Sequence, residues 1–236
     1  SRFTFETEVF LIEFDPVGAS VSSLRLKKHL DNGQPVEMLF NDGEEIPAFL
    51  LYPGDSTTNP IDAVFSYRIS GNKVIFQQTF AIVGADGKPS AETFTLQKTY
   101  NFGAKEYLFE IAVELKNSEN KAVPLNFNGF AYTIAFEPQL GPDFDTVPDG
   151  NYTYRRFYLE QGGKKTTVKL KNGLYQTADY FTWAAIVGKY FSVIAIPDAN
   201  RYSLTLTEGK SEQILLESRM YLSRPTIKAY SNVDVF

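Results

Sequence analysis

A strict alternation of apolar and polar side chains constrains the fold of this chain more than any other feature of its sequence. Successive side chains of a β-strand point to opposite faces, so a period of two predicts a strand with one face on a core. The pattern is clearest in four segments, residues 74–82, 94–102, 107–115 and 202–206. No amphipathic helix longer than two or three turns accompanies them, so we predict an all-β protein with few, short helices.

Turn signals separate the predicted strands. Asn32-Gly33, Gly162-Gly163, Asn172-Gly173 and Glu208-Gly209 are examples of dipeptides that suit the positive φ angles of tight hairpins. Many strands joined by close turns are typical of a sandwich or barrel. No linker divides the sequence, and the Pro-rich stretch 137–150 is predicted to be a loop inside the domain. We therefore expect one domain over residues 1–236, a segment of a longer protein.

Composition excludes several classes of function. A net charge of −5 argues against a nucleic-acid binder, which needs clustered Lys and Arg to neutralise phosphates. The chain has no Cys, which rules out disulfides, Cys nucleophiles and thiolate metal sites. The most apolar stretch, residues 183–197, is interrupted by Lys189 and is too short to span a membrane. We therefore expect the chain itself to be soluble and not to bind nucleic acid.

The sequence offers few residues that could form a catalytic or metal-binding site. His29 is the only histidine, and it precedes a turn, so we predict a solvated residue at a strand end rather than a catalytic group. Asp143, Asp145 and Asp149 share one loop, but their spacing departs from a calcium-binding loop, and turn formation is the favoured interpretation. We predict no catalytic residue, no cofactor and no metal, so the chain is not expected to be an enzyme.

Two aromatic clusters are the candidate binding residues. The first holds Tyr and Arg, the types enriched at interface hot spots, and an alternation between core and solvent fits it equally well. We predict a partner-binding surface in the segment 152–165, as part of an exposed edge; its candidates are Tyr152, Tyr154, Arg155, Arg156 and Tyr158. The second cluster is interpreted mainly as core packing, with stacking on a ligand in a groove as the alternative. Its candidate groove residues are Tyr180, Trp183 and Tyr190.

Several segments together resemble the large periplasmic domain of the YidC membrane protein insertase family. Residues 18–29 (GASVSSLRLKKH) and 33–39 (GQPVEML) resemble the opening of that domain. Residues 97–100 (QKTY) and 107–117 (YLFEIAVELKN) resemble its central strands. Residues 183–197 (WAAIVGKYFSVIAIP) resemble its pattern of Trp, then Lys-Tyr-Phe, then an apolar strand closed by Pro. The resemblance covers nearly the whole chain.

The resemblance implies a very large twisted sandwich, or supersandwich, similar to that of galactose mutarotases. It implies a domain on the periplasmic side of the bacterial inner membrane, in a parent protein embedded in that membrane. The implied role is non-catalytic support of membrane-protein insertion and folding, through contacts with accessory proteins of the Sec translocon or with membrane-protein substrates. The alternative is a carbohydrate-binding or mutarotase-like sandwich, and the single histidine argues against its enzymatic form.

Overall fold

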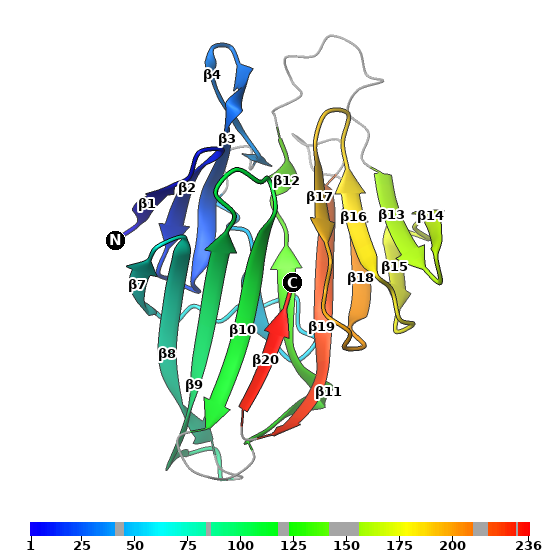
Figure 1. The fold of residues 1–236 in the computed structure, drawn as a ribbon. Coiled ribbons are helices and arrows are strands. Elements are labelled where there is room, and N and C mark those ends of the chain that lie inside the picture. Colours follow the sequence, from blue (N-terminus) through cyan, green and yellow to red (C-terminus); the bar gives the residue numbers. More distant parts are fainter. Residues whose placement is uncertain (41–44, 84–85, 118–122, 142–155, 210–216, 230) are drawn as a thin grey trace.

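The computed structural model describes residues 1–40, 45–83, 86–117, 123–141, 156–209, 217–229 and 231–236. Within these residues the chain forms 20 strands and no helix, which confirms the all-β prediction (Figure 1). Every strand pairing in the described residues is antiparallel, as expected for strands joined mainly by short turns.

The N-terminal sheet has four strands in the order β1-β2-β3-β4. Phe10, Ile12 and Phe14 are buried in β2, while the residues between them are partly exposed, as the alternation predicts. The turn from β3 to β4 places Asn32 and Gly33 at positive φ, which confirms that turn signal. The strands are β1 (Phe3–Glu6), β2 (Phe10–Asp15), β3 (Ser20–Asp31) and β4 (Gln34–Glu37).

The central sheet has five strands in the order β20-β10-β9-β8-β7. Three of the four alternating segments form its strands β8, β9 and β10. Their register places Tyr100 of β9 beside Val74 of β8 and Ile111 of β10, and all three side chains are buried. The strands are β7 (Ser66–Ser70), β8 (Lys73–Val83), β9 (Pro89–Phe102), β10 (Phe109–Asn117) and β20 (Ser231–Val235).

A third sheet joins distant parts of the chain in the order β15-β18-β19-β11-β6. The fourth alternating segment is β18, with Leu204 and Leu206 fully buried. The turn predicted at Glu208-Gly209 is wrong, because Gly209 is the last residue of β18 and pairs with Glu217. The strands are β6 (Leu50–Pro53), β11 (Val123–Phe136), β15 (Leu174–Thr177), β18 (Ser203–Gly209) and β19 (Glu217–Ala229).

A lateral sheet of four strands has the order β14-β13-β16-β17, and a two-stranded sheet pairs β5 with β12. Gly162 and Gly163, both at positive φ, form the turn from β13 to β14, as predicted. The lateral strands are β13 (Arg156–Gln161), β14 (Lys164–Val168), β16 (Trp183–Val187) and β17 (Ser192–Ala195). The short strands are β5 (Leu39–Phe40) and β12 (Gln139–Leu140).

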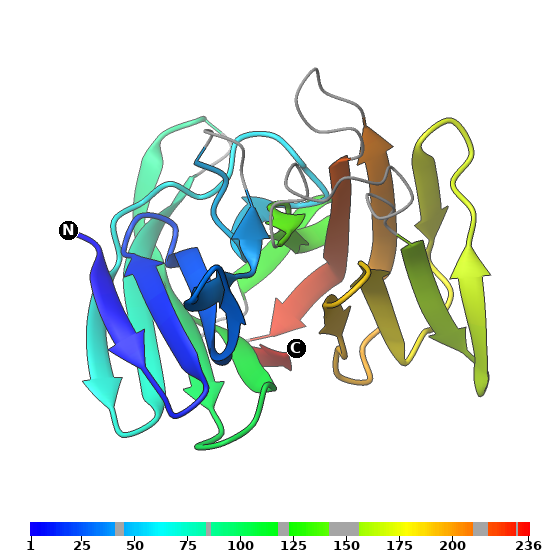
Figure 2. The same cartoon turned by 90° about the horizontal axis from the view of Figure 1, so that it is seen from above.

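The sheets form two groups on either side of β11 and β19. Figure 2 shows the N-terminal and central sheets on one side and the lateral sheet, with β15 and β18, on the other. One cluster of buried apolar side chains nevertheless includes residues of all five sheets; examples are Phe10, Tyr100, Leu204, Phe157 and Leu39. This shared core supports the proposal that residues 1–236 form a single domain.

The core face of the central sheet contains a fully buried lysine, Lys98 of β9. Its side-chain nitrogen donates hydrogen bonds to the backbone oxygens of Ala19, at 3.0 Å, and of Phe49. Ala19 and Phe49 have φ angles of 49° and 64°, which are uncommon for residues with a Cβ. The Tyr100 hydroxyl also donates to the Ala19 oxygen, at 2.9 Å. Lys98 therefore holds two strained backbone positions, and its burial lowers its pKa to about 7.

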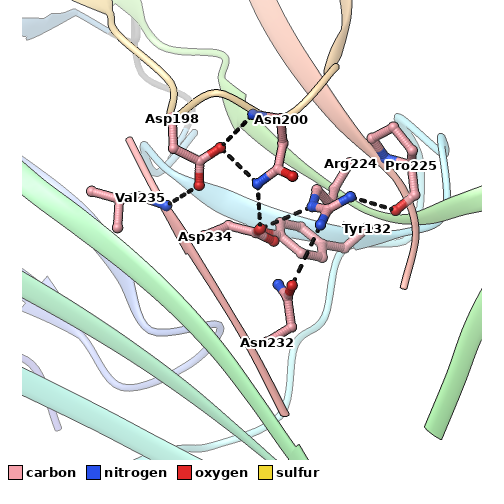
Figure 3. A network of polar contacts seen from close by, with 8 residues as sticks. All are labelled: Tyr132, Asp198, Asn200, Arg224, Pro225, Asn232, Asp234 and Val235. Carbon is pink, nitrogen blue, oxygen red and sulfur yellow. Dashed lines mark hydrogen bonds and ion pairs between the residues drawn. The ribbon is translucent and has the colours of Figure 1, made fainter. Parts of the chain in front are cut away.

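A second buried charge, Asp234, lies on β20 within a network of polar contacts (Figure 3). Its Oδ1 accepts hydrogen bonds from Arg224 Nε at 2.9 Å and from Asn200 Nδ2 at 3.2 Å. Its Oδ2 accepts from the Tyr132 hydroxyl at 2.6 Å. Burial and the neighbouring Asp234 charge raise the pKa of Tyr132 well above its usual value. The network ties β20 to β11, to β19 and to the loop that follows β17.

Candidate functional site: an apolar pocket beside β17

One concave site is an apolar pocket of about 490 Å³ between the two groups of sheets. This volume lies in the range of sites that take up ligands. Strands β2, β3, β10, β11, β17 and β19 all contribute to its walls. Its lining is Phe10, Leu24, Leu26, His29, Met38, Leu39, Phe49, Tyr107, Leu108, Phe109, Ile111, Ile134, Ala135, Phe136, Leu140, Tyr190, Phe191, Ser192, Val193, Ile194, Ala195, Met220, Leu222 and Phe236.

Four large side chains of this lining remain exposed to solvent. Tyr107 and Leu108, just before β10, are 44% and 63% exposed, and Tyr190 and Ile194, in the β16–β17 hairpin, are 60% and 46% exposed. Single exposed apolar residues are ordinary, but several around one concavity mark an interaction site. We call these four residues the rim of the pocket. The pocket therefore opens to solvent along an apolar rim.

The lining carries no Asp, Glu, Lys or Arg among the described residues. Its polar groups are the imidazole of His29, the hydroxyl of Ser192 and the hydroxyls of Tyr107 and Tyr190. General acid–base catalysis needs titratable groups within hydrogen-bonding reach of each other and of the substrate. No side chain of this lining is a carboxylate that could accompany the histidine. Its chemistry suits binding of uncharged, apolar groups.

His29 lies near the end of β3 and is exposed, as the sequence predicts. Its ring is 5.5 Å from the ring of Tyr107 and 5.7 Å from that of Phe191, measured between centroids. Its ring therefore forms part of the pocket mouth, next to two aromatic rings. Its position before a turn indicates exposure but does not reveal these neighbours, which come from distant segments.

The three predicted groove aromatics separate in the structure. Tyr190 belongs to the rim, whereas Tyr180 and Trp183 do not line the pocket. Tyr180 is exposed, and Trp183 is partly exposed on β16, the strand that pairs with β17. The sequence did not single out Tyr107, Leu108 or Ile194 as binding residues. Their exposure depends on the way distant strands meet, and an apolar residue in an alternating strand carries no sign of that.

The predicted partner surface lies only partly within the described residues. Tyr152, Tyr154 and Arg155 lie outside them. Arg156 is exposed at the start of β13, and Tyr158 is partly buried with the Lys165 nitrogen 5.3 Å from its ring centroid. The predicted edge needs correction, because β13 pairs with both β14 and β16. The outer strands of this sheet are β14, one strand further along, and β17 on the opposite side.

The loop with Asp143, Asp145 and Asp149, for which calcium binding was the alternative to turn formation, also lies outside the described residues. Among the residues that are described, no three His, Cys, Asp or Glu side chains gather as a metal site would require. The same part of the chain contains no helix with the length and apolar character needed to cross a membrane.

Solved structures with similar folds include galactose mutarotase-like proteins. One from Lactobacillus casei has a TM-score of 0.68 at 14% sequence identity and covers 100% of this chain and 98% of its own. A putative aldose 1-epimerase from Escherichia coli has a TM-score of 0.54 at 7% identity and covers 100% of this chain and 97% of its own. At such identities the likeness concerns the fold alone, and it confirms the predicted mutarotase-like sandwich.

Similar sequences indicate the family. A membrane protein insertase YidC from Treponema denticola is 30% identical over 99% of this chain and 41% of its own length. The YidC insertase of Treponema pallidum is 24% identical over 99% of this chain and 43% of its own length. The chain thus spans about two fifths of these relatives. The family model described as the YidC periplasmic domain matches residues 2–234. This chain is therefore a member of the YidC periplasmic domain family.

Proposed function

We propose that this chain is a non-catalytic binding domain of a YidC-type insertase, on the periplasmic side of the bacterial inner membrane, and that its apolar pocket receives protein partners. The observation that carries the proposal is a pocket of about 490 Å³ that no Asp, Glu, Lys or Arg side chain lines and that has an exposed apolar rim. Membrane proteins in transit expose apolar segments, and such segments fit this lining. Support for insertion and folding follows if the domain shields them for a short time.

The alternative, carbohydrate binding, finds less support in the pocket. Sugars present many hydroxyl groups, and a site that buries them must supply matching hydrogen-bond partners. Here the lining offers only one imidazole and a few hydroxyl groups against a wall of aliphatic and aromatic carbon. The mutarotase-like fold is shared, but a fold alone does not assign a function.

The test is a fluorescence titration with the uncharged apolar dye N-phenyl-1-naphthylamine. Leu108→Ser should weaken binding about threefold to tenfold, because it removes part of the aliphatic surface that the bound dye would cover. Leu174→Ser is the matched control, since Leu174 is also exposed but lies on β15, outside the pocket lining. Equal binding by both variants, or saturable binding of galactose in calorimetry, would refute the proposal.

Contact with accessory proteins of the Sec translocon is a separate proposal, for the surface formed by β13 and β14. Its support is the exposed Arg156 together with the exposed lysines Lys164 and Lys165 on the edge strand. A planar guanidinium and aromatic rings suit reversible interfaces. Titration of the periplasmic domains of those accessory proteins should show weaker binding to folded Arg156→Ala and Tyr158→Ala variants. Unchanged affinity in both would exclude this surface.

A further inference from the structure

The edge strand β17 forms one wall of the pocket, and its outer side has no partner strand among the described residues. It pairs only with β16. All four of its residues line the pocket: Val193 and Ala195 pack against the core, and Ser192 and Ile194 are exposed. A free strand edge and an apolar cavity therefore share one boundary.

The register of the hairpin shows which backbone groups face outward. The amide of Gly188 donates to the oxygen of Phe191, which makes these two residues a hydrogen-bonded pair. Hydrogen-bonded and non-hydrogen-bonded pairs alternate along an antiparallel ladder. Val193 and Ala195 therefore bond to β16, whereas the amides and carbonyls of Ser192 and Ile194 point away from it. These groups can accept and donate the bonds of an added strand.

The side chains of β17 distinguish it from the other edge of the same sheet. Exposed strand edges usually carry charged residues that discourage pairing with other chains. Lys164 and Lys165 fill this role on β14. The sequence of β17 is SVIA, with no charge and no proline. An unprotected edge beside a pocket is expected where pairing with another chain is useful.

We propose that the pocket binds an extended, uncharged, apolar polypeptide segment, which adds to β17 as a further strand and places alternate side chains in the cavity. This inference rests on the proposed function and specifies the form of the ligand. The charge of the lining favours an uncharged occupant. Because no Asp, Glu, Lys or Arg lines the pocket, the charges of a charged segment would be buried there without an opposite charge. A lipid chain would fill the cavity but would leave the outward groups of β17 without partners. The four residues of β17 span about 13 Å, enough to pair with a short segment.

The experiment compares two synthetic peptides by fluorescence polarisation with the purified chain. The first is an acetylated and amidated peptide of about six alternating Val and Thr residues, with a dye on a Gly-Ser linker. The second is the same peptide N-methylated at alternate residues, so that it cannot donate to β17. Loss of two backbone hydrogen bonds should weaken binding about tenfold or more. Because the register of the peptide is free, both alternate methylation patterns are tested, and one of them should show this loss.

A protein variant gives an independent measure. Proline is tolerated on an edge strand where the amide points outward, so Ile194→Pro removes the outward donor and leaves the amide of Val193 for β16. Ile194→Val is the control, which keeps the donor and most of the apolar contact. The Pro variant should bind the first peptide about tenfold more weakly than the Val variant.

The outcomes separate this inference from the proposed function. Equal affinity for all methylated and unmethylated peptides would overturn strand addition, and so would dye binding without any peptide binding; both would leave an apolar pocket in place. Competition by the detergent dodecyl maltoside against the dye but not against the peptide would also overturn it, since the peptide would then sit elsewhere. Absence of dye binding would instead refute the proposed function.

Discussion

Lys98 and Asp234 are both fully buried ionisable residues on strands of the central sheet, yet their surroundings are opposite. Asp234 has a guanidinium, an amide and a phenol around its two oxygens. Lys98 contacts backbone oxygens, and no ion pair joins it to a carboxylate among the described residues. A buried charge is tolerated when a partner balances it, and otherwise the group shifts its pKa toward the neutral form. One site therefore keeps an ion pair, and the other holds an amine that loses its proton near neutral pH.

The largest expected effect is at the ion pair. Asp234→Ala should lower the free energy of unfolding by about 3–5 kcal/mol, because it leaves the Arg224 guanidinium buried without its partner. Urea unfolding measures the change, with Asp179→Ala as a control at an exposed aspartate. A loss below about 1 kcal/mol would mean that Arg224 finds another partner or reaches water.

Because of Lys98, the free energy of unfolding should increase as the pH rises above neutral. Its pKa is about 7 in the folded chain and 10.5 as the unperturbed value, so the unfolded chain binds more protons between these values. Stability should therefore rise with pH, by about 2 kcal/mol between pH 7 and pH 9. Lys98→Met should remove this rise, whereas Lys73→Met, at an exposed lysine of β8, should keep it. If the free energy of unfolding of the Lys98→Met variant rises with pH as steeply as that of the unchanged chain, another group is responsible.

The smallest effect is expected at a surface ion pair. Lys27 and Glu6 approach to 2.5 Å, but their side chains are 30% and 59% exposed. Glu6→Ala should cost only about 0.2–1 kcal/mol, and the cost should shrink further in 0.5 M salt, because solvent and ions screen the pair. A cost comparable to that of Asp234→Ala would contradict the idea that burial, rather than distance, sets the value of these pairs.

Local patterns predicted much of the fold. The alternation placed β8, β9, β10 and β18, and the turn dipeptides at Asn32-Gly33 and Gly162-Gly163 formed the expected turns. The pattern also put Lys98 on the core face of β9, although its side chain alone would suggest solvent. Its partners, the carbonyls of Ala19 and Phe49, come from two loops far away in the sequence. Period-two analysis identifies a face but not the groups that meet it.

The candidate site was less predictable, because it depends on which strands become neighbours. β13 was expected near an edge, but pairing with β16 makes it internal and leaves the edges to β14 and β17. The same segment, residues 183–197, supplied the strongest family resemblance and contains both β16 and β17. The sequence shows that this segment is apolar, but not that its last strand lacks a partner. Only the register of distant strands determines that.

The position of Trp183 makes it possible to follow the edge strand β17 by fluorescence. It is the single tryptophan of the chain, and it lies partly exposed on β16, the strand that holds β17 in place. Indole emission moves to shorter wavelength when water leaves the ring. The unlabelled chain therefore carries one intrinsic optical reporter, and its emission spectrum would respond when the β16–β17 hairpin is covered, released or unfolded.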